Sequence, residues 1–424
     1  MSIRGWSGTV TTVTILLMIN DMRGPKSPFN KQPKTNETEV EDDDFMVVPE
    51  DGSPDTLPID PVEKPPKAKS KRRFHIWPEK WSTKKKRLCT AALVAVLLVA
   101  AGAGYYFYKQ ANQPTKAAVV ATKTEPPKPT TEASRLTGLQ VDPAANQRVV
   151  TGVMIENSPD ARPQSGLGEA GFVFEAVAEG GITRFLALYQ EAQPASIGPI
   201  RSARPYYLDW VLPFNATYAH VGGSPEALAQ IKSLGVRDLD QFANSGSYER
   251  ISTRYAPHNV YSSAARLYDL AQKKGYTSST FTSLPRKTEA PATPTARTID
   301  LSISGPLYNP HYDYDATTNT YKRSEGGKPH MEQNNGAQLS PKVVIALVMP
   351  SAIAADGTHN SYTTTGSNTA FIFQDGVVTQ GTWKKDSRTA QFVFSDAAGQ
   401  PIKLNPGQTW VSMVNAASSV VYTP

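Results

Sequence analysis

Hydrophobic residues in this chain gather in one long uninterrupted run and in many short ones. The long run, LCTAALVAVLLVAAGAGYYFY at residues 88–108, contains no charged side chain. About twenty apolar residues are what one helix needs to cross the hydrocarbon layer of a bilayer. The pattern therefore predicts one transmembrane helix over 88–108.

The charges beside this run predict its orientation. Four basic residues at 84–87 directly precede it, and basic residues flanking a span stay on the cytoplasmic side. We therefore expect a single-pass protein of the cell membrane with a cytoplasmic N-terminus and its C-terminal domains outside. Residues 1–87, rich in proline and charge, read as a disordered cytoplasmic tail, and the Pro/Thr-rich stretch 109–135 reads as an extended linker.

The short hydrophobic runs begin after the linker and predict a first folded domain at 136–276. Four of them are β-branched or aromatic and bounded by Gly, Pro or Asn, as strands are: 149–157, 171–179, 183–190 and 216–222. Two helices are marked by caps, Ser224 before one and Ser262 before the other. Strands and helices mixed in this order predict an α/β sandwich.

A second, smaller and mainly β domain is predicted at 298–424, after a connector at 277–297. Its five strand-like runs lie at 342–349, 369–375, 376–383, 390–396 and 408–415. Asp375-Gly376, between two of these runs, is a strong hairpin signal.

Charge and cysteine content narrow the class of protein. Residues 64–87 carry a net charge of +10 and residues 1–63 carry −7, which leaves about +3 for the rest of the chain. The folded part thus lacks the basic surface of a nucleic-acid binder. Because Cys89 is the only cysteine, an intramolecular disulfide and a multi-cysteine zinc site are excluded.

Two carboxylates and three arginines interrupt the apolar runs of the first domain. Glu175 and Glu179 are four residues apart, which places both on one face of a regular strand. Such a pair suits general acid or base catalysis or the binding of a cation. Alternatively, each carboxylate pairs with Arg184, Arg201 or Arg204.

The segment Arg201-Ser202-Ala203-Arg204-Pro205 predicts an anion site. Proline favours the first position of a helix, and a helix start presents free backbone N–H groups beside the guanidinium forks. Together with Arg184, this segment is the predicted floor of an anion-binding cleft. The alternative is a pair of solvated surface arginines.

Two further polar clusters follow. His220, Gly222, Gly223 and Ser224 form a strand end, a Gly-rich turn and a capped helix, a second possible anion cradle. The alternative is that His220 has a purely structural role. The cluster lacks the Lys of a P-loop and the spacing of a dinucleotide fingerprint.

Arg254, His258 and Asn259 form the third cluster. His258 is a candidate general base or metal ligand, and Asn259 a candidate to orient a substrate oxygen. A turn histidine bonded to the backbone is the alternative. Zinc is not predicted, because no second His or acid lies at ligand spacing.

Several motifs resemble the YerB-like family of bacterial lipoproteins and membrane-anchored proteins. They are ARPQSGL (161–167), AEGGITRF (178–185), IGPIRSARPYY (197–207), HVGGSPEAL (220–228), APHNVY (256–261), GTWKKDSRT (381–389) and IKLNPGQTWV (402–411). The resemblance covers about 140–424 and implies a two-domain envelope protein, without implying a reaction. The chain departs from the family at its anchor, a predicted transmembrane helix in place of a lipobox.

A fainter similarity links 218–242 to the LytR-CpsA-Psr enzymes, which transfer lipid-linked glycopolymers to peptidoglycan. That resemblance implies pyrophosphate binding at Arg201, Arg204, Arg237 and Asp238. In those enzymes an acid after Arg-Ser holds a divalent cation. Here that position is Ala203, so a divalent cation is possible but not supported.

The sequence thus predicts a membrane-anchored envelope protein that binds an anionic ligand, a phosphate-bearing glycan or lipid-linked precursor, in an arginine-rich cleft. One alternative is a hydrolase or phosphotransferase acting on cell-wall glycopolymer with Glu175, Glu179 or His258. The other is a non-catalytic scaffold. Unpaired arginines in an open cleft favour binding, unpaired carboxylates beside His258 favour the enzyme, and buried ion pairs between the domains favour the scaffold.

Overall fold

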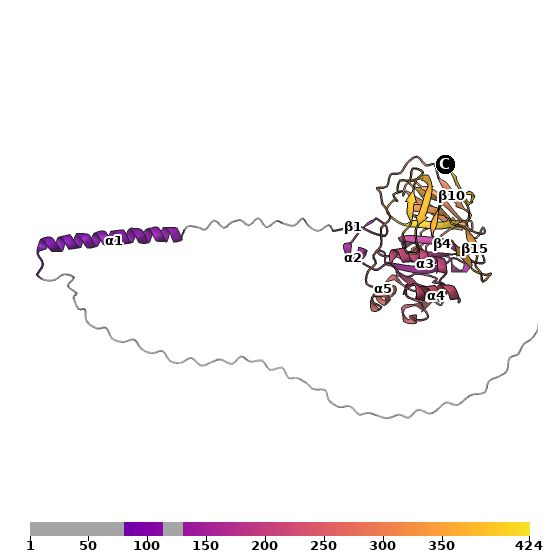
Figure 1. Cartoon of the computed structure of the whole chain (residues 1–424), viewed down its shortest axis with the longest axis horizontal. Helices are drawn as coiled ribbons and strands as arrows, with labels where there is room; N and C mark the ends of the chain where they lie inside the picture. Colours follow the sequence, from indigo (N-terminus) through magenta and orange to yellow (C-terminus); the bar gives the residue numbers. More distant parts are fainter. Residues whose placement is uncertain (1–79, 113–129) are drawn as a thin grey trace, which may run out of the picture. The chain divides into compact units, whose positions relative to one another are not determined.

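The computed structural model describes residues 80–112 and 130–424 (Figure 1). Two compact units result, one in each described range, and each is treated by itself. Most of the predicted cytoplasmic tail and the middle of the predicted linker lie outside the described residues.

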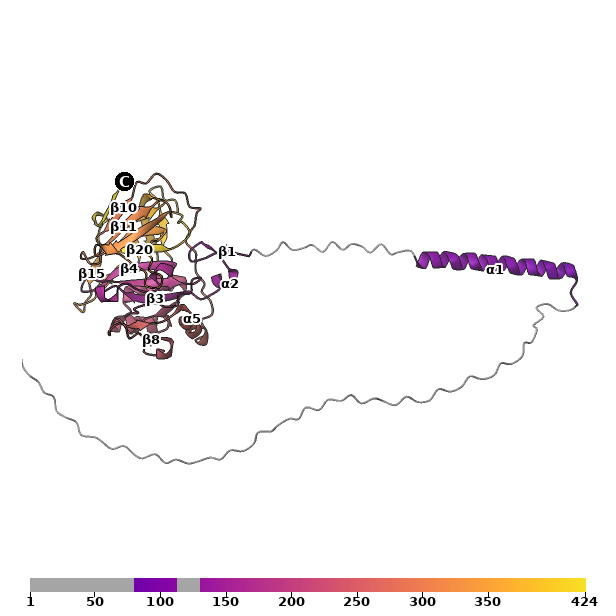
Figure 2. The same ribbon diagram turned by 180° about the vertical axis from the view of Figure 1, so that it is seen from behind.

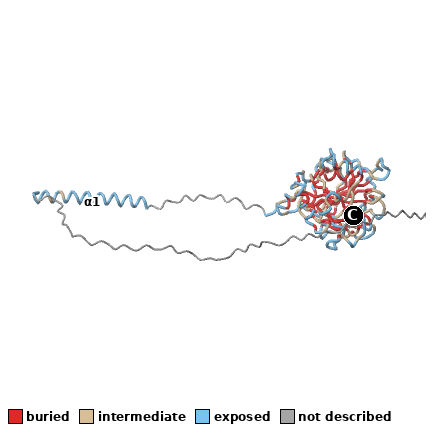
Figure 3. Tube along the Cα trace, turned by 90° about the horizontal axis from the view of Figure 1, so that it is seen from below, coloured by how far each residue is buried: buried red, intermediate tan, exposed pale blue. Residues whose placement is uncertain are grey.

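The first unit contains helix α1 (Thr83–Ala111). It begins just before the four basic residues and covers the whole predicted apolar run, and none of its residues is buried (Figure 3). With a mean hydropathy of 2.1 over its best window, α1 is long and apolar enough to cross a membrane by length and composition. The predicted apolar helix is confirmed.

The second unit is built on a sheet of ten strands that draws on both predicted domains. In spatial order they are β19 (Val393–Ser395), β18 (Val377–Lys385), β17 (Gly366–Gln374), β14 (Val343–Val348), β20 (Thr409–Val414), β4 (Phe172–Glu179), β5 (Ile182–Tyr189), β3 (Thr151–Glu156), β6 (Thr217–Ala219) and β7 (Arg237–Asp238). Parallel pairing of β4 with β20 joins the two halves. The connector at 277–297 therefore separates two stretches of sequence whose strands share one sheet.

Helices cover both faces of the N-terminal half of this sheet. Helices α3 (Pro205–Val211) and α4 (Pro225–Ser233) share a core with Phe172, Phe174 and Leu186. Helix α5 (Ala264–Lys273) packs with residues of opposite parity, such as Val153 and Phe185. This alternation follows from the period of two along a strand.

The helix caps bear out one sequence prediction and correct another. Ser224 caps α4, with its Oγ accepting a hydrogen bond from the backbone N–H of Ala227. The cap of α5 is Ser263 rather than Ser262. Ser262 is fully buried and its Oγ donates to the carbonyl of Ser247 instead.

A second sheet packs against the C-terminal half of the first (Figure 2). Its order is β13 (Lys328–Pro329), β12 (Thr320–Glu325), β11 (Pro310–Asp315), β10 (Thr298–Leu301) and β21 (Val420–Thr423). The C-terminal region is therefore mainly β, as predicted. The predicted hairpin at Asp375-Gly376 is also confirmed: both residues have positive φ and link β17 to β18.

The remaining elements are short and lie mostly in loops. They are β1 (Glu132–Ala133), β2 (Gln140–Val141), α2 (Pro143–Asn146), β8 (Glu249–Arg250), β9 (Val260–Tyr261), β15 (Ser351–Ile353), β16 (Asn360–Tyr362) and the 3₁₀ turns Pro159–Ala161, Leu167–Glu169, Leu212–Phe214, Ser245–Ser247 and Ala417–Ser419.

Candidate functional site

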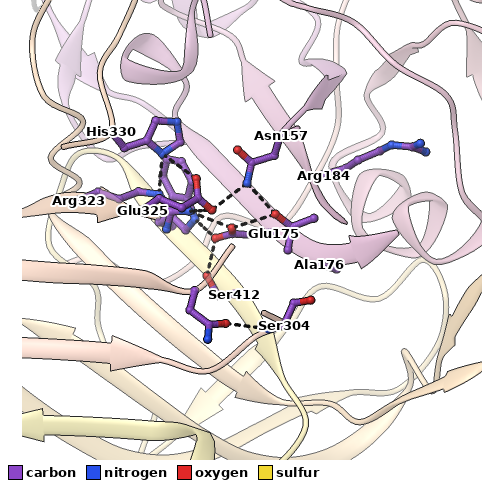
Figure 4. A network of polar contacts seen from close by, with 12 residues as sticks. Asn157, Glu175, Ala176, Arg184, Ser304, Arg323, Glu325, His330 and Ser412 are labelled. Carbon is purple, nitrogen blue, oxygen red and sulfur yellow. Dashed lines mark hydrogen bonds and ion pairs between the residues drawn. The ribbon is translucent and has the colours of Figure 1, made fainter. Parts of the chain in front are cut away.

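Glu175 lies inside the molecule, not in a cleft (Figure 4). Its Oε1 accepts a hydrogen bond from Arg323 Nη2 at 2.9 Å, and its Oε2 accepts from Trp410 Nε1 at 2.9 Å and Ser412 Oγ at 3.1 Å. The side chains of Glu175 and Arg323 are both completely buried. Glu175 is therefore committed to a structural ion pair and cannot reach an external substrate.

Arg323, on β12, is the centre of this network. Its Nε donates to His330 Nδ1, its Nη1 to Tyr312 Oη, and its Nη2 to Glu325 Oε1 as well as to Glu175. Attraction to the surrounding carboxylates outweighs burial and raises the pKa of Arg323, so the guanidinium is charged. The ion pair with Glu175 ties the two halves of the second unit together.

The sequence around Arg323 contains a signal for its burial. In β12 the residues Tyr321, Arg323 and Glu325 alternate with more exposed neighbours, so all three face inward. A charged residue in step with a buried tyrosine indicates a buried ion pair.

Glu179 does not share a face with Glu175, so that prediction is wrong. A β-bulge between Val177 and Glu179 shifts the register of β4 against β5, and one extra residue reverses the alternation of side chains. Glu179 consequently meets Arg184 and Arg204, which lie on the α3 side. Figure 4 shows Arg184 apart from the Glu175 network.

Glu179 pairs with two of the three arginines of the predicted cleft floor. It forms an ion pair with Arg184 and accepts two hydrogen bonds from Arg204, from Nε to Oε2 at 2.9 Å and from Nη2 to Oε1 at 2.7 Å. The arginine side chains are only 4% and 6% exposed. Arg184 also donates to the carbonyl of Ser202. Glu179 is thus an internal anion for the arginine pair.

Arg201 points elsewhere, to a second buried carboxylate, Glu156 at the end of β3. Arg201 Nε lies 3.5 Å from Glu156 Oε1, and His258 Nδ1 lies 2.9 Å from Glu156 Oε2. Ser158 Oγ donates to Glu156 Oε1 at 3.0 Å. One buried acid therefore holds an arginine and a histidine next to each other.

Both side chains held by Glu156 remain partly exposed, 24% for Arg201 and 22% for His258. Because Nδ1 of His258 faces a carboxylate, it carries the proton in the neutral ring, and Nε2 is left as an acceptor. Neither Nε2 of His258 nor Nη2 of Arg201 bonds to another residue in the described ranges. Burial lowers the pKa of Arg201, an effect that Glu156 opposes.

Glu156 and Ser158 were missed because no motif marks them. Glu156 ends an otherwise apolar strand, and Ser158 stands in the following turn. A charge at the end of a buried run is a weak signal, since most such residues simply face solvent.

The predicted cradle around His220 is closed. His220 is fully buried, and its ring nitrogens face the carbonyl of Gly222 at 2.8 Å and Asp238 Oδ1 at 3.0 Å. The N–H of Gly222 donates to Asp240 Oδ1. Gly223 packs so closely on Ala203 that a Cβ would lie 3.1 Å from the alanine methyl group. These residues connect the turn to its neighbours, which favours the structural alternative for His220.

Arg254 and Asn259 are also engaged within the protein. Arg254 donates to the carbonyls of Asp160 and Pro163, and Asn259 accepts a hydrogen bond from Arg250. Arg254 thereby fixes the loop at 159–163, which follows Glu156 and Ser158.

The positions suggested by the LytR-CpsA-Psr resemblance are dispersed. Arg237 donates to the carbonyls of Asn215 and Ser278, and Asp238 bonds to His220. Within residues 80–112 and 130–424, no group of three or more His, Cys, Asp or Glu is arranged to hold a metal ion.

Comparison with known proteins identifies the family. Residues 136–277 match the N-terminal domain and residues 299–411 the C-terminal domain of the DUF3048 family, described as a protein of unknown function. The chain is 30% identical over 285 residues to "Putative lipoprotein YerB" of Bacillus subtilis (strain 168), covering 66% of this chain and 85% of that protein. The crystal structure of YerB from Bacillus subtilis superposes with a TM-score of 0.63 at 28% identity, covering 69% of this chain and all of that one. The chain belongs to the DUF3048 family and is a homologue of YerB.

Proposed function

We propose that this protein is held in the membrane by α1 and binds an anionic ligand of the cell envelope on the opposite, extracytoplasmic side. The ligand class is a phosphate-bearing glycan or its lipid-linked precursor. The name of the YerB homologue and the apolar helix support the location. Of the three predicted arginines, Arg201 is the one we assign to the ligand, because the other two are buried and already paired with Glu179.

The observation that carries this proposal is the convergence of Arg201 and His258 on buried Glu156. A guanidinium with a free N–H edge binds phosphate or carboxylate. A neutral imidazole with a free Nε2 accepts a hydrogen bond from a hydroxyl group. A phosphorylated glycan offers both groups, and Glu156 restricts the two side chains before the ligand arrives.

Titration of the full chain in nanodiscs of zwitterionic lipid tests the proposal. Pyrophosphate, a polyprenyl phosphate and wall fragments are added with and without magnesium, and heat release and melting temperature are recorded. We expect Arg201→Ala to weaken binding of the best ligand about tenfold or more. Arg266→Ala removes an exposed arginine of α5 and is the matched control. Equal binding by both variants contradicts the proposal.

A second candidate, a hydrolase or phosphotransferase, is favoured by the hydrogen bond between Glu156 and His258. A carboxylate that orients a histidine and leaves Nε2 open is an arrangement used by general bases. If this candidate is correct, His258→Asn abolishes turnover of a bound wall fragment and changes its affinity only a few-fold. If it is wrong, the wild-type chain binds the fragment and returns it unchanged.

The third candidate is a scaffold without a ligand. The buried ion pair between Glu175 and Arg323 supports it, because it joins the two halves without facing a cleft. A scaffold predicts no heat release with any of the three ligand classes and no difference between Arg201→Ala and Arg266→Ala.

A further inference from the structure

A cavity of about 410 Å³ lies between the loop at 159–163 and the β12–β13 hairpin. Its size suits a small ligand. Apolar side chains supply most of the wall: Pro159, Pro163, Leu307, Pro329 and Met331. Neither Arg201 nor His258 lines it.

Three charged side chains interrupt the apolar wall. Arg162 is held by hydrogen bonds from its Nε and Nη2 to Asn157 and from its Nη2 to the carbonyl of Leu307. Its Nη1 bonds to no residue in the described part of the chain and lies near Gly326. Lys328 is exposed and forms no ion pair with a described residue. The cavity therefore presents two cationic donors.

The third charged group is Glu325, whose side chain is 1% exposed. Its Oε1 accepts hydrogen bonds from Asn157 and Arg323. Its Oε2 lies 3.3 Å from Arg162 Nη2 in an ion pair but accepts no hydrogen bond from a described residue. The cavity wall includes this residue. A buried carboxyl oxygen without a hydrogen bond, at the wall of a cavity, can be satisfied by a ligand atom.

The protonation state of Glu325 decides which ligand suits that atom. Burial, opposed by Arg323 and Arg162 but reinforced by Glu175, raises the pKa of Glu325 to about 7. His330 also faces it, at 3.4 Å from Nδ1, and is neutral because burial and Arg323 hold its pKa well below the usual value. A protonated Glu325 donates a hydrogen bond from its carboxyl group, and the natural acceptor is another carboxylate.

We propose that this cavity binds a short apolar segment that ends in a carboxylate, as the end of a small peptide does. The carboxylate lies between Arg162 Nη1, Lys328 Nζ and the carboxyl group of Glu325. The apolar body lies against the prolines, Leu307 and Met331. The positive charges of Arg162 and Lys328 complement the negative charge of the ligand carboxylate. The apolar wall disfavours a highly hydrated anion such as free phosphate, which would lose its water on entering.

Calorimetric titration of the full chain in zwitterionic nanodiscs at pH 6 tests this proposal. The probes are N-acetyl-alanyl-alanine, its C-terminal amide, hexanoate and inorganic phosphate. We expect the dipeptide acid to bind about tenfold or more tightly than its amide. If hexanoate binds as tightly as the dipeptide acid, a carboxylate and an apolar body are sufficient for binding. If hexanoate binds more weakly, the site is specific for peptides. Phosphate as the tightest ligand overturns the proposal.

Variants locate the site. Lys328→Glu should weaken binding of the dipeptide acid about tenfold, while Lys403→Glu, at an exposed lysine outside the cavity, should leave it unchanged. Raising the pH from 6 to 8 should weaken binding to the wild-type chain and have less effect on Glu325→Gln, which cannot ionise. Equal affinity for acid and amide, or equal effects of the two lysine variants, refutes a carboxylate site at this cavity.

Discussion

At the scale of single residues, two buried acids and one partly buried acid organise the second unit. Glu175, Glu156 and Glu179 each hold one or more cations inside the protein, and each fixes a different part of the fold. A buried charge is costly unless it is paired. Removing one partner of a buried ion pair should therefore cost more stability than removing one partner of an exposed ion pair.

The first prediction concerns the pair between Arg323 and Glu175. Arg323→Met should lower the free energy of unfolding by roughly 3–5 kcal/mol, because it leaves Glu175 buried without its cation. Arg266→Met breaks a half-exposed pair with Glu249 and should cost at most about 1 kcal/mol. Thermal and chemical unfolding of the full chain in nanodiscs measures both. Equal losses in the two variants would show that burial of the network contributes nothing.

The second prediction is a pH dependence of stability from Glu325. Its pKa is raised from an ordinary 4.5 to about 7 in the folded protein. The folded state therefore holds this proton more tightly than the unfolded state. Its contribution to stability is complete below pH 4.5 and is lost as the pH rises to about 7. Glu325→Gln should flatten the melting temperature across this range relative to the wild-type chain. An unchanged pH profile in the variant would assign the effect to other groups.

At the scale of elements, the regular helices and strands could be predicted from the sequence, whereas the irregular features could not. The apolar helix, the strands at 149–157, 171–179 and 183–190 and the cap at Ser224 follow from period, length and capping chemistry. The bulge near Glu179 has no signature in the sequence, yet it decides which way that carboxylate faces. Glu156 was missed because no motif marks it and its partners Arg201 and His258 are distant in sequence.

The third prediction concerns this bulge and its ion pairs. Glu179→Ala leaves Arg184 and Arg204 buried side by side, and the pKa of Arg204 is already lowered by burial and by Arg184. We expect a loss of up to about 3 kcal/mol, below that of Arg323→Met because Glu179 is partly exposed. Glu226→Ala, at an exposed acid of α4, is the control for loss of one negative charge. Unfolding curves of the two variants measure this loss of free energy. If Glu179→Ala loses no more than Glu226→Ala, Glu179 does not stabilise the buried arginines.

At the scale of the whole molecule, the described residues of the second unit form one compact body built from two family domains. Five N-terminal strands, β3 to β7, are continuous in one sheet with five strands of the C-terminal region. The loop at 159–163 and the β12–β13 hairpin belong to different domains but enclose one cavity.

The fourth prediction follows from the shared sheet. The second unit should unfold in one transition, because separating the domains breaks the pairing of β4 with β20 and buries no replacement surface. Residues 130–276 expressed alone should not fold, since both core clusters that cover their sheet include C-terminal residues such as Val411 and Trp410. Coincident unfolding curves from tryptophan fluorescence and circular dichroism are expected. Two separate transitions, or a folded fragment, would contradict this prediction.

The pairing of β4 with β20 also sets an order of events during biosynthesis. Glu175 and Ser412 are register partners in the centre of the sheet, although more than half of the chain lies between them. Contacts so distant in sequence form late in folding. When a ribosome has completed the first domain, the edge of β4 is still open to incorrect pairing, and it stays open until residues 409–414 have emerged. A nascent chain stalled before residue 409 should therefore depend on chaperones, however complete its first domain is.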